Sequence, residues 1–162
     1  MKIRLFVTGG TFDKIYNEID GNLTFKETHL NEILEIIRND VPVEIETLML
    51  IDSLDMNDNH RKQILEKCKS CKEDKIIITH GTDTMAETAR FLDNEIKNKT
   101  IVLTGAMVPY SFGKSDALFN LGSAIISAQF MPNGIYIVMN GRLFDCNNVR
   151  KNVRIGRFEK IK

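Results

Sequence analysis

The chain has 162 residues, 43% of them hydrophobic and 27% charged, and its 22 basic residues balance 22 acidic ones. This length and composition are typical of one globular domain with a single core. The zero net charge excludes a global positive field for nucleic acid or an anionic membrane, and no apolar run approaches the about 20 residues of a membrane span, so we expect a small-molecule partner.

The N-terminal segment and the cysteines indicate the compartment. A short apolar run before two glycines is not the pattern of a secretory signal, and an odd count of three cysteines fits a reducing compartment, so we predict a cytoplasmic protein. Cys68 and Cys71 form a C-x-x-C pair, but no second pair follows. They share helical spacing with Ile64 and Leu65, and we interpret them as buried structural cysteines rather than zinc ligands or a redox pair.

Apolar runs alternate with amphipathic stretches along the chain. In chain order the pattern predicts strand 2–8, helix 28–39, strand 43–49, helix 58–72, strand 75–79, helix 84–94, strand 100–104, helix 115–129 and strand 135–140. The strands are nearly continuous in apolar residues, which is typical of strands covered on both faces. We therefore predict a single-domain α/β fold, a doubly wound, mostly parallel sheet with helices on both faces, in a flavodoxin-like or Rossmann-like three-layer arrangement.

The expected helices begin at residues that cap helix N-termini. These are Thr28, Asn57 or Asp58, and Thr84, which has Glu87 three residues later as in a capping box.

Two segments lie outside this pattern. The loop 12–27 contains a glycine, several charges and few large apolar residues, and it is predicted to be a lid. The tail 141–162 is basic and follows the last expected strand, so we expect short extra strands at the sheet edge or a flap.

Polar residues and glycines collect after four of the expected strands. In an open parallel sheet the ligand crevice lies at the carboxyl ends of the strands. The turns there are residues 8–12, 51–55, 79–84 and 104–109. Each turn alone has a structural explanation, because glycines suit tight turns and hydroxyls or carboxylates cap helices. Four such turns on one edge favour a ligand site.

The common nucleotide, metal and hydrolase motifs are missing. The "TGGT" turn is not a G-x-G-x-x-G fingerprint, no P-loop or G-x-S-x-G elbow occurs, and His29, His60 and His80 have no metal-ligand spacing. We interpret His80 as a structural hydrogen-bonding group under its turn. The remaining nucleophiles are Thr11 and Thr82, and either would need a lysine or tyrosine as its base.

Six segments together resemble one known family. The segments "TGGTF" and "HGTDTMAETARFLD" resemble the two signatures of the bacterial-type L-asparaginase family. Further matches are "IDSLDMND", "VLTGAMVP", "SDALFNLGSAI" and "VRKN", and all six segments occur in the family's order over nearly the whole chain. The resemblance implies an amidohydrolase of asparagine, with some action on glutamine, that uses no metal or cofactor.

The resemblance also implies roles for individual residues. Thr11 matches the nucleophile that forms an acyl-enzyme, and Tyr16 matches a mobile-loop tyrosine that activates it. Thr82, Asp83 and Lys151 match a second set, in which a neutral lysine takes a proton from the threonine hydroxyl or from water.

The substrate is expected to be held at both of its charges. Asp83 is expected to bind the α-ammonium group and Ser53 the α-carboxylate. The other expected substrate-binding positions are Gly10, Asp52, Gly81, Thr82 and Ala106.

The chain departs from the family at two points. Leu54 replaces a polar residue that contacts the substrate in many members, which puts the choice of amide in doubt. Family enzymes also carry a smaller C-terminal domain, and residues 1–162 are expected to be the N-terminal domain alone. We expect a homodimer to cover the surface left by that domain.

Three functional hypotheses follow. The first is an asparaginase-like amidohydrolase acting on a free amino-acid amide. The others are a non-catalytic amino-acid-binding relative and an ammonia-generating subunit of a larger amidotransferase assembly.

Overall fold

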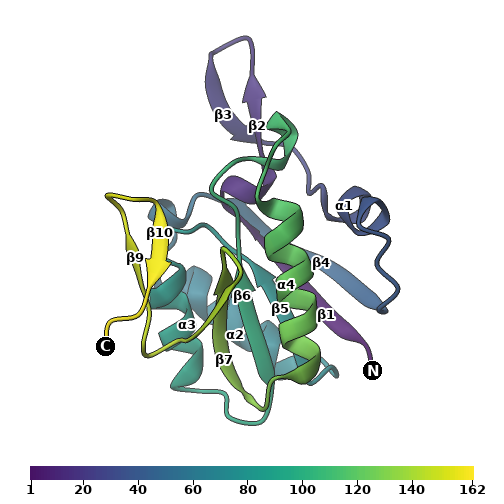
Figure 1. Ribbon diagram of the computed structural model, residues 1–162, viewed down its shortest axis with the longest axis vertical. Helices are drawn as coiled ribbons and strands as arrows, with labels where there is room; N and C mark the ends of the chain where they lie inside the picture. The colour runs from purple at the N-terminus through teal and green to yellow at the C-terminus, as the bar shows by residue number, and fades with distance from the viewer.

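A computed structural model describes residues 1–162. The fold is organised around one six-stranded sheet (Figure 1). The strand order is β4-β1-β5-β6-β7-β8. The first five strands are parallel neighbours, and β8 runs antiparallel to β7 at the edge. The bounds are β1 (Ile3–Gly9), β4 (Val43–Ile51), β5 (Lys75–Thr79), β6 (Thr100–Thr104), β7 (Gly134–Met139) and β8 (Arg142–Asp145).

Helices cover both faces of this sheet, as Figure 1 shows. One core holds Ile76 and Ile78 of β5, while Ile77 belongs to the other, because successive side chains of a strand point to opposite faces. The predicted doubly wound fold is therefore confirmed. No helix is long and apolar enough to cross a membrane. The first core is covered by α2 (Asp58–Ser70) and α3 (Met85–Asp93), and the second by α1 (Leu30–Ile36) and α4 (Ala117–Phe130).

The cap predicted at the start of α2 is present, and the capping box predicted at the start of α3 is not. The Asn57 side chain accepts from the backbone N–H of His60 in a capping box at the start of α2. The capping box expected at Thr84 is wrong. The Thr84 hydroxyl instead donates to the carbonyl of Ser53 at 2.8 Å, and Glu87 accepts from Arg61 at 3.0 Å. Both side chains thus bind neighbouring segments rather than their own helix.

The helix expected over 28–39 is shorter than predicted. It begins after the cap position His29 and ends at Ile36, and the chain then turns through a positive φ of 54° at Arg38. Thr28 still supports the start, because its hydroxyl accepts from the N–H of Leu30 at 3.3 Å.

The segment 12–27 is not an irregular loop. It forms a short 3-10 helix and a two-stranded hairpin that projects above the carboxyl-end edge of the sheet (Figure 1). Its base is closed by Asp13, whose carboxylate accepts from the hydroxyl of Thr28 at 2.9 Å. The elements are η1 (Thr11–Asp13), β2 (Lys14–Asn17) and β3 (Asn22–Phe25).

The tail forms a second small hairpin beside the main sheet. Its strands are β9 (Arg150–Asn152) and β10 (Arg157–Glu159), and Lys151 pairs with Phe158. The Phe158 ring is 3% exposed and belongs to the core under α2 and α3. The extra strand expected at the sheet edge is β8, and β9 and β10 form a separate hairpin that one phenylalanine anchors.

The three cysteines are free thiols. Cys68 and Cys146 are buried, and burial raises the pKa of the Cys146 thiol to about 12. Cys71 is only partly buried, so the predicted burial of the C-x-x-C pair holds for Cys68 alone.

His80 supports the turn after β5 from below, as predicted. Its Nδ1 donates to the carbonyl of Gly81 at 2.7 Å, and its Nε2 lies 2.9 Å from the Thr88 hydroxyl. Burial, with a smaller contribution from the charge of Arg61, lowers the pKa of His80 to about 4. The imidazole is therefore a neutral structural group at neutral pH.

Replacement of Phe158 by alanine should release the tail hairpin. Removing a buried phenylalanine costs about 3–5 kcal/mol of unfolding free energy, which urea denaturation measures. The matched control is Val153→Ala, because Val153 is 74% exposed in the same hairpin and its truncation should change little. Equal effects of the two substitutions would contradict the anchoring role.

The buried His80 should make stability depend on pH. The folded state binds the imidazole proton less tightly than the unfolded state. The contribution of His80 to the free energy of unfolding is therefore fully present above the unfolded pKa of 6.5 and is lost as pH falls toward about 4. The full loss is about 3 kcal/mol. His80→Gln should show a weaker fall in unfolding free energy between these pH values, whereas His60→Gln should keep it. An unchanged slope in His80→Gln would refute the assignment.

Candidate active site

The four polar turns singled out in the sequence lie side by side. They follow β4, β1, β5 and β6, which are consecutive in the sheet, and parallel strands bring their carboxyl ends to one edge. The turns also bind each other through the backbone. The N–H of Gly10 donates to Ile51 at 2.9 Å, and the N–H of His80 donates to Thr104 at 2.9 Å. The predicted convergence of these turns is confirmed.

Two glycines allow three of these turns to touch. Gly10 has a φ of 76°, and a Cβ on it would lie 2.4 Å from the Cα of Gly81. A Cβ on Gly81 would lie 2.5 Å from the Oγ of Ser53. Only glycine fits at such contacts. The residues that follow these glycines, Thr11 and Thr82, therefore lie at the same edge of the sheet.

Ser53 begins the 3-10 helix η2 (Ser53–Asp55) beneath these glycines. It is 1% exposed, and its Oγ has no hydrogen-bond partner. The preceding residue, Asp52, holds the turn by accepting from the N–H of Leu54 at 3.0 Å. A buried hydroxyl without a partner is uncommon in proteins and is a candidate ligand contact.

Lys151 reaches this edge from the tail hairpin. Its Nζ donates to the Oγ1 of Thr82 and to the Oδ1 of Asp83, both at 2.7 Å. The lysine side chain is only 12% exposed and that of Asp83 is 38% exposed. Lys151 thus forms one hydrogen-bonded set with two adjacent residues that lie 69 and 68 positions earlier in the chain.

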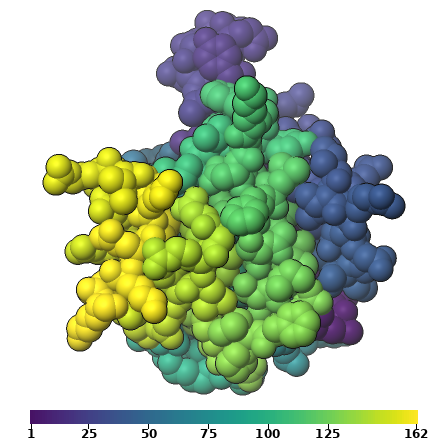
Figure 2. Space-filling model, in the orientation of Figure 1, coloured from purple at the N-terminus to yellow at the C-terminus, as the bar shows by residue number.

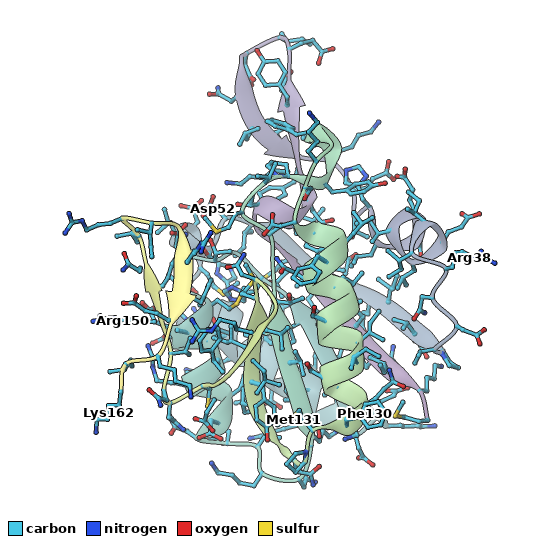
Figure 3. The ribbon with its side chains drawn as sticks, in the orientation of Figure 1. Arg38, Asp52, Phe130, Met131, Arg150 and Lys162 are labelled. Atoms are coloured by element: carbon cyan, nitrogen blue, oxygen red, sulfur yellow. The ribbon has the colours of Figure 1, made fainter.

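Asp52 lies near the tail hairpin at the upper edge of the sheet (Figure 3). Burial alone would raise the pKa of this carboxyl, but its ion pair with Lys14, the N–H of Leu54 and the charge of Lys151 hold the pKa below its usual range. Lys14 was not among the predicted site residues. No motif marks it, and only its place three residues after Thr11 hints at a role.

The remaining predicted residues are placed less directly. Thr11 begins η1 and is partly exposed. Tyr16 is 55% exposed on the projecting hairpin, and its hydroxyl lies 3.9 Å from a Cβ placed on Gly21. This conformation points the Tyr16 hydroxyl toward the hairpin turn. Ala106 is fully buried in the core under α4, and Leu54 is 72% exposed.

A family model and several known proteins match this chain. The model described as "Asparaginase, N-terminal" matches residues 2–157. L-asparaginase 2 of Escherichia coli (strain K12) is 41% identical over 115 residues, which are 67% of this chain and 33% of that protein. The probable periplasmic L-asparaginase of Haemophilus influenzae is 34% identical over 162 residues, which cover 92% of this chain and 46% of the relative.

Solved structures of L-asparaginases also match this chain. The thermostable L-asparaginase from Thermococcus kodakarensis superposes with a TM-score of 0.88 at 29% identity, over 99% of this chain and 51% of that chain. A probable cytoplasmic L-asparaginase from Campylobacter jejuni gives a TM-score of 0.83 at 27% identity, over 98% and 52%.

The chain thus spans about half the length of these relatives, or less. Because their names include both a periplasmic and a cytoplasmic protein, the cytoplasmic location remains a prediction. A family model that covers nearly the entire sequence, together with the structural matches, shows that the chain belongs to the asparaginase family and corresponds to its N-terminal domain.

Proposed function

We propose that this chain hydrolyses the side-chain amide of L-asparagine to aspartate and ammonia, with Thr11 as the nucleophile. The observation that carries the proposal is the hydrogen-bonded set of Lys151, Thr82 and Asp83. This set lies at the turn that touches Gly10, the residue before Thr11. Membership of the asparaginase family supports amide chemistry at this place.

The reaction proceeds through an acyl-enzyme. The Thr11 oxygen attacks the amide carbon, and its proton passes to the amide nitrogen, which leaves as ammonia. Water then attacks the ester carbon, so the products are aspartate and the restored hydroxyl. Backbone N–H groups at the Thr11 and Thr82 turns are the donors we assign to the developing oxyanion.

Lys151 and Thr82 form the proton-transfer pair. The Nζ donates to the Oγ1 at 2.7 Å in the resting site. Once the ammonium has given up its proton, the same contact lets Lys151 accept a proton from the hydroxyl or from a water in its place. Asp83 fixes the lysine by its own hydrogen bond and presents a half-exposed carboxylate to the substrate's α-ammonium group.

The amino-acid head group lies over the Ser53 turn. Ser53 has a buried hydroxyl without a partner, to which we assign the α-carboxylate of the substrate. Gly10 and Gly81 allow the two neighbouring turns to approach this serine closely. Leu54 points largely to solvent and its side chain offers no hydrogen bond, so we assign it no part in the choice between asparagine and glutamine.

The projecting hairpin acts as the lid. It carries Tyr16, whose hydroxyl must leave the region of Gly21 to approach Thr11, so closure of the hairpin over the bound amide is part of the proposal.

A second copy of the chain is the partner we assign to the outer face of α4. Figure 2 shows this face across the middle of the molecule. It exposes Phe119 by 61%, Ile126 by 58% and Phe130 by 79%, and residues 117–130 include no charged side chain. Paired apolar faces related by a two-fold axis would remove this patch from water.

Ammonia release tests the assignment of Thr11. Thr11→Ala should lower the rate of ammonia release from asparagine by at least about a thousandfold, because no other group forms the acyl-enzyme. Thr82→Ala should be similarly impaired, while Thr47→Ala, at an exposed threonine of β4, should retain the wild-type rate.

Three outcomes would replace the proposal. An active Thr11→Ala protein would exclude Thr11 as nucleophile. Asparagine binding by the wild type without ammonia release would indicate an amino-acid-binding relative. Ammonia release only in the presence of a co-purifying protein, detected by light scattering, would indicate a subunit of a larger assembly.

A further inference from the structure

The predicted site has no positive charge reserved for the α-carboxylate of the substrate. Ser53 is neutral, and the ammonium of Lys151 already bonds to Thr82 and Asp83. A carboxylate taken out of water needs a cation or several hydrogen-bond donors to offset its desolvation. One serine hydroxyl offsets only a small part of this desolvation cost.

Lys14 supplies a positive charge at the required place. It is the first residue of β2, and its side chain is 16% exposed. Its ammonium is paired with Asp52, which directly precedes Ser53. The charge therefore lies beside the turn to which the α-carboxylate is assigned.

The backbone of Lys14 is fixed between the nucleophile and the lid. Its N–H donates to the carbonyl of Thr11, and its carbonyl accepts from the hydroxyl of Ser111 at 2.8 Å. The ammonium also lies 6.0 Å from the centre of the Phe25 ring, on the other strand of the hairpin. These contacts leave the long side chain as the mobile part, which can exchange one carboxylate for another.

The charges at the edge balance in a way that suits a zwitterion. Two lysines, Lys14 and Lys151, face two carboxylates, Asp52 and Asp83. If Asp52 alone were taken by a cationic ligand, Lys14 would be left partly buried and unpaired, which is unfavourable. A ligand with both an ammonium and a carboxylate replaces both halves of the Lys14–Asp52 pair.

We propose that Lys14 is a specificity-determining residue. Its ammonium group breaks its ion pair with Asp52 and binds the α-carboxylate of the substrate. Asp52, released from this pair, joins Asp83 at the α-ammonium group. The inference rests on the proposed use of this site for an amino-acid amide, and it makes the Lys14–Asp52 pair the group that selects a zwitterionic head.

Binding of three matched amides tests this exchange. The ligands are L-asparagine, succinamate, which lacks the α-ammonium, and β-alaninamide, which lacks the α-carboxylate. Calorimetry on Thr11→Ala protein measures binding without turnover. Lys14→Met should weaken binding of asparagine and succinamate by roughly 10- to 100-fold, the usual effect of losing a charged hydrogen bond. It should leave β-alaninamide unchanged or bound more tightly, because Asp52 is then free.

Two control variants separate charge from structure. Lys14→Arg should retain the preference for ligands with a carboxylate. Lys26→Met removes an exposed lysine directly after the hairpin and should change none of the three affinities. Thermal unfolding of each variant checks that the hairpin change does not unfold the protein.

The outcomes distinguish this inference from the proposed reaction. Equal loss for all three ligands, or no loss for any, would overturn the role of Lys14 even if the wild type releases ammonia. A carboxylate-dependent loss would support the role of Lys14 even if the wild type releases none. Failure of the Thr11→Ala protein to bind any of the three ligands would overturn the role of Lys14, and ammonia release by the wild type would still support the proposed reaction.

Discussion

Direct backbone contact between the turns after β1 and β5 is the constraint on which the site depends. Gly10 and Gly81 approach so closely that a methyl group on either would occupy the space of the other turn or of Ser53. Because no side chain separates them, the residues that follow, Thr11 and Thr82, are held at the same edge. The close approach of the two glycines places both threonines at this edge, where Lys151 donates to Thr82.

The second constraint is the anchoring of the tail. Lys151 would be a solvated lysine near the end of the chain if its hairpin were not fixed. Its cross-strand partner Phe158 is buried in the core under α2 and α3, and cross-strand neighbours lie on the same face of a hairpin. Hydrophobic burial at one residue therefore positions a charged group at another, and it supplies the base of the proposed reaction.

Sequence patterns predicted the sheet and the site edge because each depends on local signals. Continuous apolar strands indicated a sheet covered on both faces, and the polar turns after them indicated the ligand edge. The prediction of a capping box at Thr84 was wrong because the Thr84 hydroxyl donates instead to the carbonyl of Ser53, 31 positions away. The hairpin in 12–27 was missed because its strands are short and project from the sheet, so they lack an apolar pattern.

The site was predictable where a motif surrounded the residue and not where a long-range contact defined it. Thr82 and Asp83 stand in a recognisable segment, and Lys151 was found through "VRKN". Lys14 has no such segment, and its relation to Asp52 arises only when the η1 turn folds beside η2. The position of Tyr16 depends in turn on the projecting hairpin, whose closure over the substrate is part of the proposed function.

The most direct test of the central constraint compares two glycines with the same backbone geometry. Gly10 and Gly113 have φ values of 76° and 68°, but a Cβ on Gly113 meets nothing within 4 Å. Asparagine affinity and unfolding free energy should therefore fall far more in Gly10→Ala than in Gly113→Ala, which suffers only backbone strain of about 1–3 kcal/mol. Equal losses in the two variants, or asparagine binding that survives Gly10→Ala unchanged, would contradict the claim that contact between the turns creates the site.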